Sequence, residues 1–174
     1  MIIGSISEDK KKEKRISITP EIAKKYISNG FDVIIESNLA SHLGILDEEF
    51  VNQGCKIDNR ENVLKKSDVI LQLNLPDNES TNLINEKKIL IGNFNSTKNK
   101  DEINRISNKN VSVFSMELLP RITRAQSMDI LSSQANLAGY KAVVDSFALF
   151  KKAIPMMMTA AGTISAAKVL VVGA

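Results

Sequence analysis

Polar side chains gather in one stretch of the sequence, between Pro120 and Ala142. They supply two guanidinium groups, a carboxamide, a carboxylate and a hydroxyl, at Arg121, Arg124, Gln126, Asp129 and Ser132. Gln126, Asp129 and Ser132 follow at intervals of three residues, so in a helix they share one face. The start of a helix offers unpaired N–H groups and partial positive charge, which suit a carboxylate or a polar ligand. Such a set could hold the amide and the hydroxyls of a nucleotide.

The residues around this polar set have the spacing of a buried helix. Apolar side chains recur at steps of three and four, at Met128, Leu131, Ala135, Ala138 and Ala142. This pattern predicts one stripe that faces a core. A helix over residues 126–152 spans about 38 Å at 1.5 Å per residue. We therefore expect it to connect one domain to the next.

The first 116 residues alternate short apolar runs with helical patterns, which is typical of an α/β layer. We expect strands at residues 2–6, 32–36, 55–57, 68–75, 89–91 and 111–116. Helices are expected to begin at Pro20 after the N-cap Thr19, at Asp47 as a cap, at Arg60, before Asn85 and near Asp101. Right-handed crossovers then predict a parallel, doubly wound sheet of flavodoxin-like or Rossmann-like topology.

The C-terminal residues 167–174 have the pattern of an apolar strand that enters a turn at Gly173. A dinucleotide-binding domain opens in this way, with a glycine-rich phosphate-binding turn after its first strand. We therefore expect a lobe over residues 1–125, a connector helix over 126–152, and the crossover and first strand of a truncated Rossmann domain over 153–174. A C-terminal edge strand is the alternative for this last segment.

Composition excludes several classes of protein. The chain of 174 residues is 43% hydrophobic, carries a net charge of +3 and has 5% aromatic residues, so it is globular and a weak candidate for binding nucleic acid. Cys55 is the only cysteine, and we expect a buried structural thiol. No signal peptide or membrane-spanning run is evident, which predicts a cytoplasmic protein without direct membrane insertion. No metal-ligand spacing, P-loop or serine-hydrolase motif occurs.

The run PRITRAQSMDILSSQANLAGYKAV, followed by MMMTAAGTISAAKVLVVGA, closely resembles a known family. It is similar to the NAD(H)-binding component, the N-terminal part of the α subunit, of proton-translocating NAD(P) transhydrogenases, which are relatives of alanine dehydrogenase. The resemblance extends across the chain, more loosely before Met116. Its implication is an enzyme that passes hydride between NAD(H) and NADP(H) and couples this to proton translocation, of which the present chain alone would be inactive.

The resemblance also implies roles for single residues. Arg121, Asp129 and Ser132 would hold the carboxamide and ribose side of NAD(H), and Gln126 would reach toward NADP(H) carried by a partner domain. Contacts from the same loop and from the phosphate turn would come from Ile122, Thr123, Arg124 and Gly173. Of these residues, Arg121, Gln126 and Asp129 are the catalytic candidates. The implied partners are a second copy of the chain and the NADP(H)-binding and membrane-spanning transhydrogenase subunits, which would hold the protein at the periphery of the inner membrane.

Two alternatives remain open. An alanine dehydrogenase needs a lysine and a histidine to manage protons on the substrate. At the corresponding places this chain has Asn74 before Pro76 and Asn93 after the fifth strand, and its one histidine, His42, lies in an earlier loop. Arg15 fits both branches of the family and does not discriminate between them. The second alternative is a lobe without catalysis that acts in dimerisation or regulation.

Overall fold

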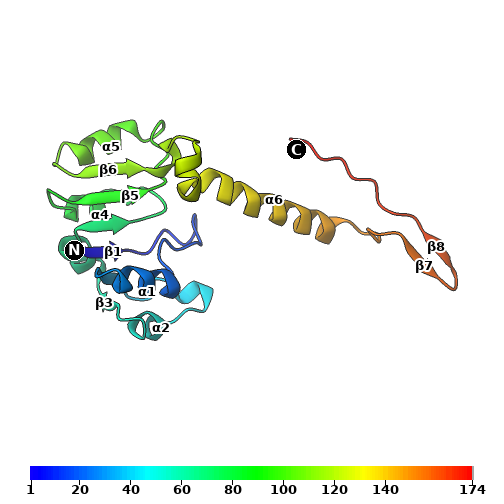
Figure 1. The fold of residues 1–174 in the computed structure, drawn as a ribbon, viewed down its shortest axis with the longest axis horizontal. Coiled ribbons are helices and arrows are strands. Elements are labelled where there is room, and N and C mark those ends of the chain that lie inside the picture. Colours follow the sequence, from blue (N-terminus) through cyan, green and yellow to red (C-terminus); the bar gives the residue numbers. More distant parts are fainter. Residues whose placement is uncertain (174) are drawn as a thin grey trace. The chain divides into compact units, whose positions relative to one another are not determined.

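The first of two units, residues 1–129, is built around a six-stranded sheet. The computed structural model describes residues 1–173. The strands are β1 (Ile2–Ser5), β2 (Asp32–Glu36), β3 (Lys56–Asp58), β4 (Val69–Leu71), β5 (Ile89–Gly92) and β6 (Ser112–Ser115). Their order across the sheet is β3-β2-β1-β4-β5-β6, and every neighbouring pair is parallel (Figure 1). The predicted parallel Rossmann-like sheet is confirmed.

Helices separate the strands along the chain. They are α1 (Pro20–Ser28), α2 (Asp47–Val51), α3 (Arg60–Lys66), α4 (Asn78–Leu83) and α5 (Lys100–Ser107), with a 3-10 helix η1 (Ser41–Leu43) before α2. Helix α1 begins as predicted, since Pro20 follows the N-cap Thr19, whose hydroxyl accepts a bond from the Ile22 N–H at 3.4 Å. The prediction that Asp47 caps α2 is wrong. Its carboxylate lies inside the helix and accepts a bond from the Asn38 N–H at 2.9 Å.

Two apolar clusters form the core, one on each face of the sheet. Val33 and Ile35 of β2 belong to the cluster that includes Ala23 of α1 and Phe50 of α2, whereas the intervening Ile34 belongs to the other. The second cluster joins the sheet to α3, α4 and α5. Successive strand residues point to opposite faces, so burial on both faces requires the unbroken apolar runs that the sequence shows. Helices on both faces make the fold doubly wound.

After β6 the first unit ends in two short 3-10 helices, η2 (Met116–Leu118) and η3 (Thr123–Met128). The carboxylate of Glu117 accepts bonds from the N–H groups of Phe94 at 3.2 Å and Ser96 at 2.7 Å. These bonds fix η2 to the loop that follows β5. Ala125, with 6% of its surface exposed, is the buried residue of η3.

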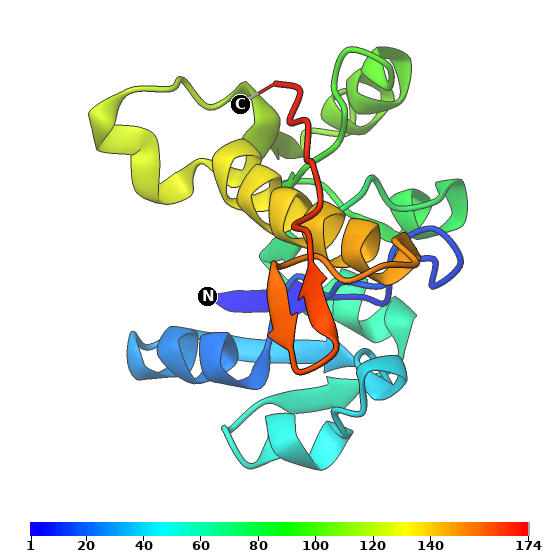
Figure 2. The ribbon, with the colours of Figure 1, turned by 90° about the vertical axis from the view of Figure 1, so that its right-hand side faces the viewer.

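The second unit, residues 130–174, holds the long helix α6 (Ile130–Leu149) and an antiparallel hairpin of β7 (Met157–Thr159) and β8 (Gly162–Ile164) (Figure 2). The expected buried stripe on this helix is wrong, since no residue of α6 is buried in the described chain. Leu131, Leu137 and Val143 are exposed and follow at intervals of six residues, which turns each about 240° from the last around the helix axis. Apolar side chains therefore face every side of α6.

The expected strand over residues 167–172 does not form in the structure. A strand needs a neighbour that accepts and donates its backbone hydrogen bonds, and no strand among residues 1–173 pairs with this segment. Its apolar side chains are open, with Val169 71% and Leu170 87% exposed. That residues 153–174 open a Rossmann domain, and that the lobe ends at residue 125, stay predictions.

Candidate functional site

The predicted nucleotide-binding residues lie in and around η3. Arg121, Ile122, Thr123, Arg124 and Gln126 are exposed, and Asp129 is half-buried. The turn is closed by bonds from the Ala125 N–H to the Ile122 carbonyl at 2.9 Å and from the Asp129 N–H to the Gln126 carbonyl at 3.3 Å. The buried Ala125 anchors the turn, so the longer side chains beside it extend into solvent.

The geometry differs from one continuous helix. Gln126 lies in the 3-10 helix η3, Asp129 has φ −74° and ψ 91°, and α6 begins only at Ile130. An extended residue directly before a helix occupies the N-cap position, where aspartate is favoured. The prediction that Gln126, Asp129 and Ser132 share one helical face is therefore wrong, because the helix starts after the first two of them.

Three of these polar side chains are available to a ligand. Within residues 1–173 no protein acceptor or donor engages the guanidinium groups of Arg121 and Arg124 or the carboxamide of Gln126. They offer N–H donors and, at Gln126, a carbonyl oxygen, the groups that a nicotinamide carboxamide and a ribose would need. This segment therefore fits the polar part of a dinucleotide.

The remaining two predicted residues belong to the second unit. Ser132 is exposed in the first turn of α6. Gly173 has φ +83°, a left-handed conformation that favours glycine, as a phosphate-binding turn would require. Whether they act together with the residues of η3 stays a prediction.

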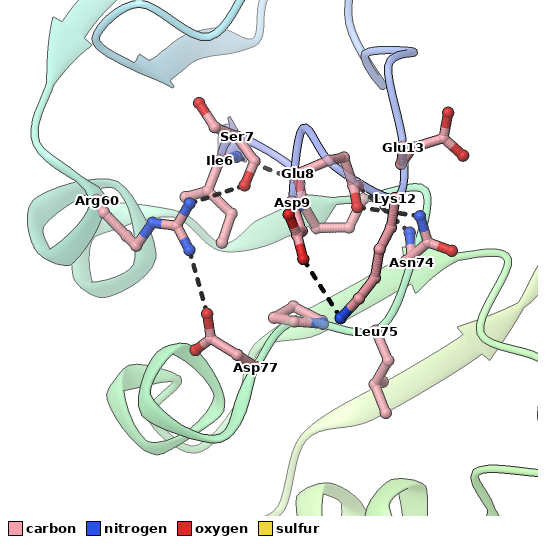
Figure 3. A pocket seen from close by; sticks show the side chains of 12 residues that line it. Ile6, Ser7, Glu8, Asp9, Lys12, Glu13, Arg60, Asn74, Leu75 and Asp77 are labelled. Atoms are coloured by element: carbon pink, nitrogen blue, oxygen red, sulfur yellow. Dashed lines mark hydrogen bonds and ion pairs between the residues drawn. The ribbon is translucent and has the colours of Figure 1, made fainter.

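A cavity that the sequence did not predict lies at the carboxyl ends of β1 and β4 and has a volume of about 410 Å³ (Figure 3). Its walls come from the loop of residues 6–13 after β1, from residues 72–77 after β4, and from Arg60 of α3. The chain leaves β1 toward β2 on one side and leaves β4 toward β5 on the other. Ligands of open α/β sheets bind at such a reversal of strand order.

Arg60 forms one fixed wall of this cavity, which we call the β1–β4 cavity. Its guanidinium donates to the Ser7 carbonyl at 2.7 Å, to the Glu36 carboxylate at 3.2 Å and to the Ser80 hydroxyl at 3.2 Å, and it lies 3.5 Å from the Asp77 carboxylate. Figure 3 shows it between Ser7 and Asp77. Arg60 thus ties together the chain segments that follow β1, β2 and β4.

The loop after β1 is fixed to the segment after β4 by Glu8. Its carboxylate accepts bonds from the Leu73 N–H at 2.7 Å, from the Asn74 N–H at 3.3 Å and from the Asn74 side-chain amide at 3.1 Å. Asn74, which stands where an alanine dehydrogenase would have lysine, is therefore already engaged. Lys12 pairs with Asp9 at 3.3 Å in the same loop.

The other residues considered for proton chemistry have structural roles. Arg15 binds the Glu13 carboxylate at 2.6 Å, and its hydrogen bond lowers the pKa of Glu13 to about 2. His42 contacts the Lys14 carbonyl oxygen through Nε2 at 2.7 Å and is exposed. Burial raises the pKa of Cys55 to about 11, so its thiol stays protonated near neutral pH. Among residues 1–173 no group of three or more His, Cys, Asp and Glu side chains is arranged to hold a metal ion.

Sequence reasoning missed the β1–β4 cavity because its residues are far apart in the chain. Glu8 and Asn74 are 66 positions apart and meet only because β1 and β4 are neighbours in the sheet. The usable signal was the predicted doubly wound topology itself, which places the polar residues that follow β1 and β4 at one edge.

Comparison with known proteins identifies the family. Residues 4–138 match the family described as "Alanine dehydrogenase/PNT, N-terminal domain". The chain is 41% identical over 99% of its length to the first part of NAD(P) transhydrogenase subunit alpha of Rickettsia prowazekii and 38% identical over 99% to that of Rhodospirillum rubrum, covering 46% and 47% of those proteins. The crystal structure of transhydrogenase from Sinorhizobium meliloti superposes with a TM-score of 0.90 and 39% identity, over 96% of this chain and 50% of that one.

The chain thus spans about half the length of these relatives. No helix among residues 1–173 is long and apolar enough to cross a membrane. The match covers most of the sheet, η3 and the start of α6, so it includes both the fold and the predicted polar segment. The protein belongs to the alanine dehydrogenase/PNT N-terminal domain family, on its transhydrogenase side.

Proposed function

We propose that this chain is part of the NAD(H)-binding component of a transhydrogenase that passes hydride between NAD(H) and NADP(H). In the complete enzyme, membrane-spanning partners couple this transfer to proton translocation, and the protein is peripheral to the membrane through them. The present chain alone is inactive. The observation that carries the proposal is the set of unengaged donors at Arg121, Arg124 and Gln126 in a chain whose relatives, over its whole length, are transhydrogenase subunits.

The residues near η3 divide the work. Arg121, Asp129 and Ser132 hold the carboxamide and ribose side of NAD(H), while Gln126 contacts the NADP(H) carried by the partner domain. Ile122, Thr123 and Arg124 contribute from the same loop, and Gly173 belongs to the phosphate turn. Their common task is to position two rings.

The nicotinamide supplies the hydride chemistry when it is bound. Direct transfer between two nicotinamides moves no proton at a heteroatom of the reacting carbons, so the protein contributes position and polarity and needs no general base. This agrees with a segment that offers amide and guanidinium groups and holds no histidine or lysine between Arg121 and Ser132.

The test is Gln126→Asn in the full-length protein assembled with its partner subunits. Shortening the side chain by one methylene withdraws the carboxamide from the partner's cofactor while its chemistry is kept. We expect hydride transfer to fall by at least tenfold, a change of about 1.4 kcal/mol in the barrier. Binding of NADH, measured by calorimetry, should change little, since Gln126 contacts the other nucleotide. An unchanged transfer rate removes Gln126 from the mechanism.

An alanine dehydrogenase is the second candidate, because the same family includes that enzyme. The structure disfavours it at one place, since Asn74 stands in the position of the catalytic lysine and is bound to Glu8. The complete protein should show no alanine-dependent formation of NADH. Such formation would make the dehydrogenase the better assignment.

A dimerisation module without catalysis is the third candidate, and the exposed apolar side chains around α6 favour it. Tyr140 is 71% and Leu149 80% exposed in the described chain. A homodimer also belongs to the transhydrogenase proposal, so dimer formation alone does not separate the two. Binding of NADH by the full-length protein does, because a module that acts only in dimerisation would not bind it.

A further inference from the structure

The β1–β4 cavity has more negative than positive charge in its walls. Four carboxylates and two cations line it, at Glu8, Asp9, Glu13, Asp77, Lys12 and Arg60. The volume of about 410 Å³ is within the range of small-molecule sites. Its charge therefore favours a small cation over an anion of the same size.

The two cations are already committed to the protein. All three nitrogens of the Arg60 guanidinium donate to protein acceptors, the carbonyl of Ser7, the Glu36 carboxylate and the Ser80 hydroxyl among them. Lys12 is paired with Asp9. Neither group is left to neutralise a phosphate or a carboxylate, so an anion would enter a negative cavity without a counter-charge.

Glu8 differs from the other three carboxylates. Asp9 pairs with Lys12, Glu13 pairs with Arg15, and Asp77 lies 3.5 Å from Arg60. Within the described residues Glu8 accepts hydrogen bonds only from backbone and side-chain amides and takes part in no ion pair within 4.0 Å. It is the carboxylate of the cavity with charge left to neutralise.

Gln72 adds a second and independent observation. Only 4% of its surface is exposed, and its Oε1 accepts bonds from the Ile6 N–H and the Ser5 hydroxyl, both at 3.2 Å. The backbone N–H can only donate, which fixes the amide so that Oε1 faces Ile6 and the Nε2 group is turned away from it.

The Nε2 group of Gln72 has no acceptor in the part of the chain that the structure describes, although Gln72 lines the cavity. No fully enclosed side-chain nitrogen or oxygen of those residues lacks a partner, so Nε2 keeps a small opening, and the cavity supplies it. A nearly buried amide donor is satisfied only by an acceptor that enters this opening, so the position suits an oxygen of a ligand.

From these observations we propose that the β1–β4 cavity binds a small molecule that carries a protonated amine together with a hydroxyl or carbonyl oxygen. The amine lies against the carboxylates of Glu8 and Asp77, and the oxygen accepts a bond from Gln72 Nε2. The site is separate from the segment at η3 and does not depend on the transhydrogenase proposal.

Ethanolamine, ethylene glycol and glycolate are matched probes for the full-length protein. All three are two-carbon molecules with a hydroxyl, and at pH 7 they carry charges of +1, 0 and −1. The readout is the ¹⁵N and ¹H shift of the Gln72 side-chain amide during titration. We expect saturable shifts with ethanolamine, affinity at least about tenfold lower for ethylene glycol, and no binding of glycolate. Equal affinities for the three probes, stronger binding of glycolate, or no shift at Gln72 would each overturn the proposal.

Two substitutions separate the charge from the fold. Glu8→Gln keeps an oxygen acceptor for the Leu73 and Asn74 N–H groups, and Asp77→Asn keeps an N-cap for the Ser80 N–H, while each removes one negative charge. We expect each to weaken ethanolamine binding about tenfold or more. Glu61→Gln, on the exposed side of α3 in an ion pair with Lys65, is the control and should leave the affinity unchanged. Ethanolamine binding that survives both cavity substitutions would refute the proposed site.

Discussion

Replacing Arg60 with methionine should destabilise the first unit strongly, because one side chain joins three segments at the carboxyl edge of the sheet. Methionine fills a similar volume but removes every donor. The Glu36 carboxylate, whose side chain is 18% exposed, loses its cation and keeps the bond from the Ser7 N–H at 2.7 Å. The Ser7 carbonyl and the Ser80 hydroxyl lose their donors as well.

The expected loss can be built from these contacts. Hydrogen bonds to charged groups contribute about 1.5–3 kcal/mol each, and Arg60 makes two close ones, to Glu36 and to Ser7. The pair with Asp77, at 3.5 Å and 62% exposed, adds less than about 1 kcal/mol. Since the Arg60 side chain is 34% exposed, the lower end applies, and we expect a total loss of about 3 kcal/mol.

Amide hydrogen exchange of β1 and β4 measures this loss, since it reports the opening of the first unit by itself. Arg60→Lys should lose about half as much, because one ammonium reaches fewer of the acceptors. Lys65→Met, which removes an exposed pair with Glu61 from the same helix, should cost less than about 0.5 kcal/mol. An Arg60→Met loss below about 1 kcal/mol, or one equal to that of Lys65→Met, would refute the reasoning.

Three further perturbations follow from single contacts. Gly92→Ala would place its Cβ 2.2 Å from the backbone oxygen of Gln72, and we expect a loss of about 3 kcal/mol in urea unfolding, since backbone cannot yield as a side chain can. Arg15→Met should return the pKa of Glu13 from about 2 toward 4.5 in an NMR titration; in the unaltered protein the contribution of this pair is present above pH 4.5 and is lost as the pH falls toward 2. Cys55, whose pKa burial raises to about 11, should react with a disulfide reagent only as fast as the protein unfolds.

Each of these three has its own control. Gly30→Ala has open space around its Cβ at φ +84°, so it should cost only about 1 kcal/mol, and a larger effect than at Gly92 would contradict the packing argument. Asp32, which is paired with the exposed Lys56 at 3.7 Å, should titrate unchanged in Arg15→Met. A Cys55 reaction rate that urea does not accelerate would mean that the thiol is accessible in the folded chain.

The strands of the first unit were predictable because their signal is local. Continuous apolar runs such as Val33 to Ile35 are required wherever both faces of a strand are covered, and such runs stand out in a sequence. Thr19 and Pro20 identify the start of α1 in the same way, through the type of residue that a helix start prefers. The order of the strands followed from general rules of connection rather than from any residue.

Other features depend on what the chain contacts, and these were not predictable. The spacing of apolar residues from Met128 onward continues through η3 into α6, so periodicity alone does not show that the helix begins at Ile130. Val169 to Val172 carries the composition of a strand, yet a strand exists only where a second one pairs with it. The β1–β4 cavity likewise joins Glu8 to residues more than sixty positions away.

The position of β1 in the middle of the sheet has a consequence for how the chain is made. As synthesis proceeds, β2 emerges to find β1, β3 finds β2, β4 finds β1, β5 finds β4 and β6 finds β5. Each new strand therefore pairs with one that has already left the ribosome, and none has to wait exposed for a later partner. The sheet can grow outward from its centre in the order of translation, first toward β3 and then toward β6, which shortens the time that unpaired strand edges are open to aggregation.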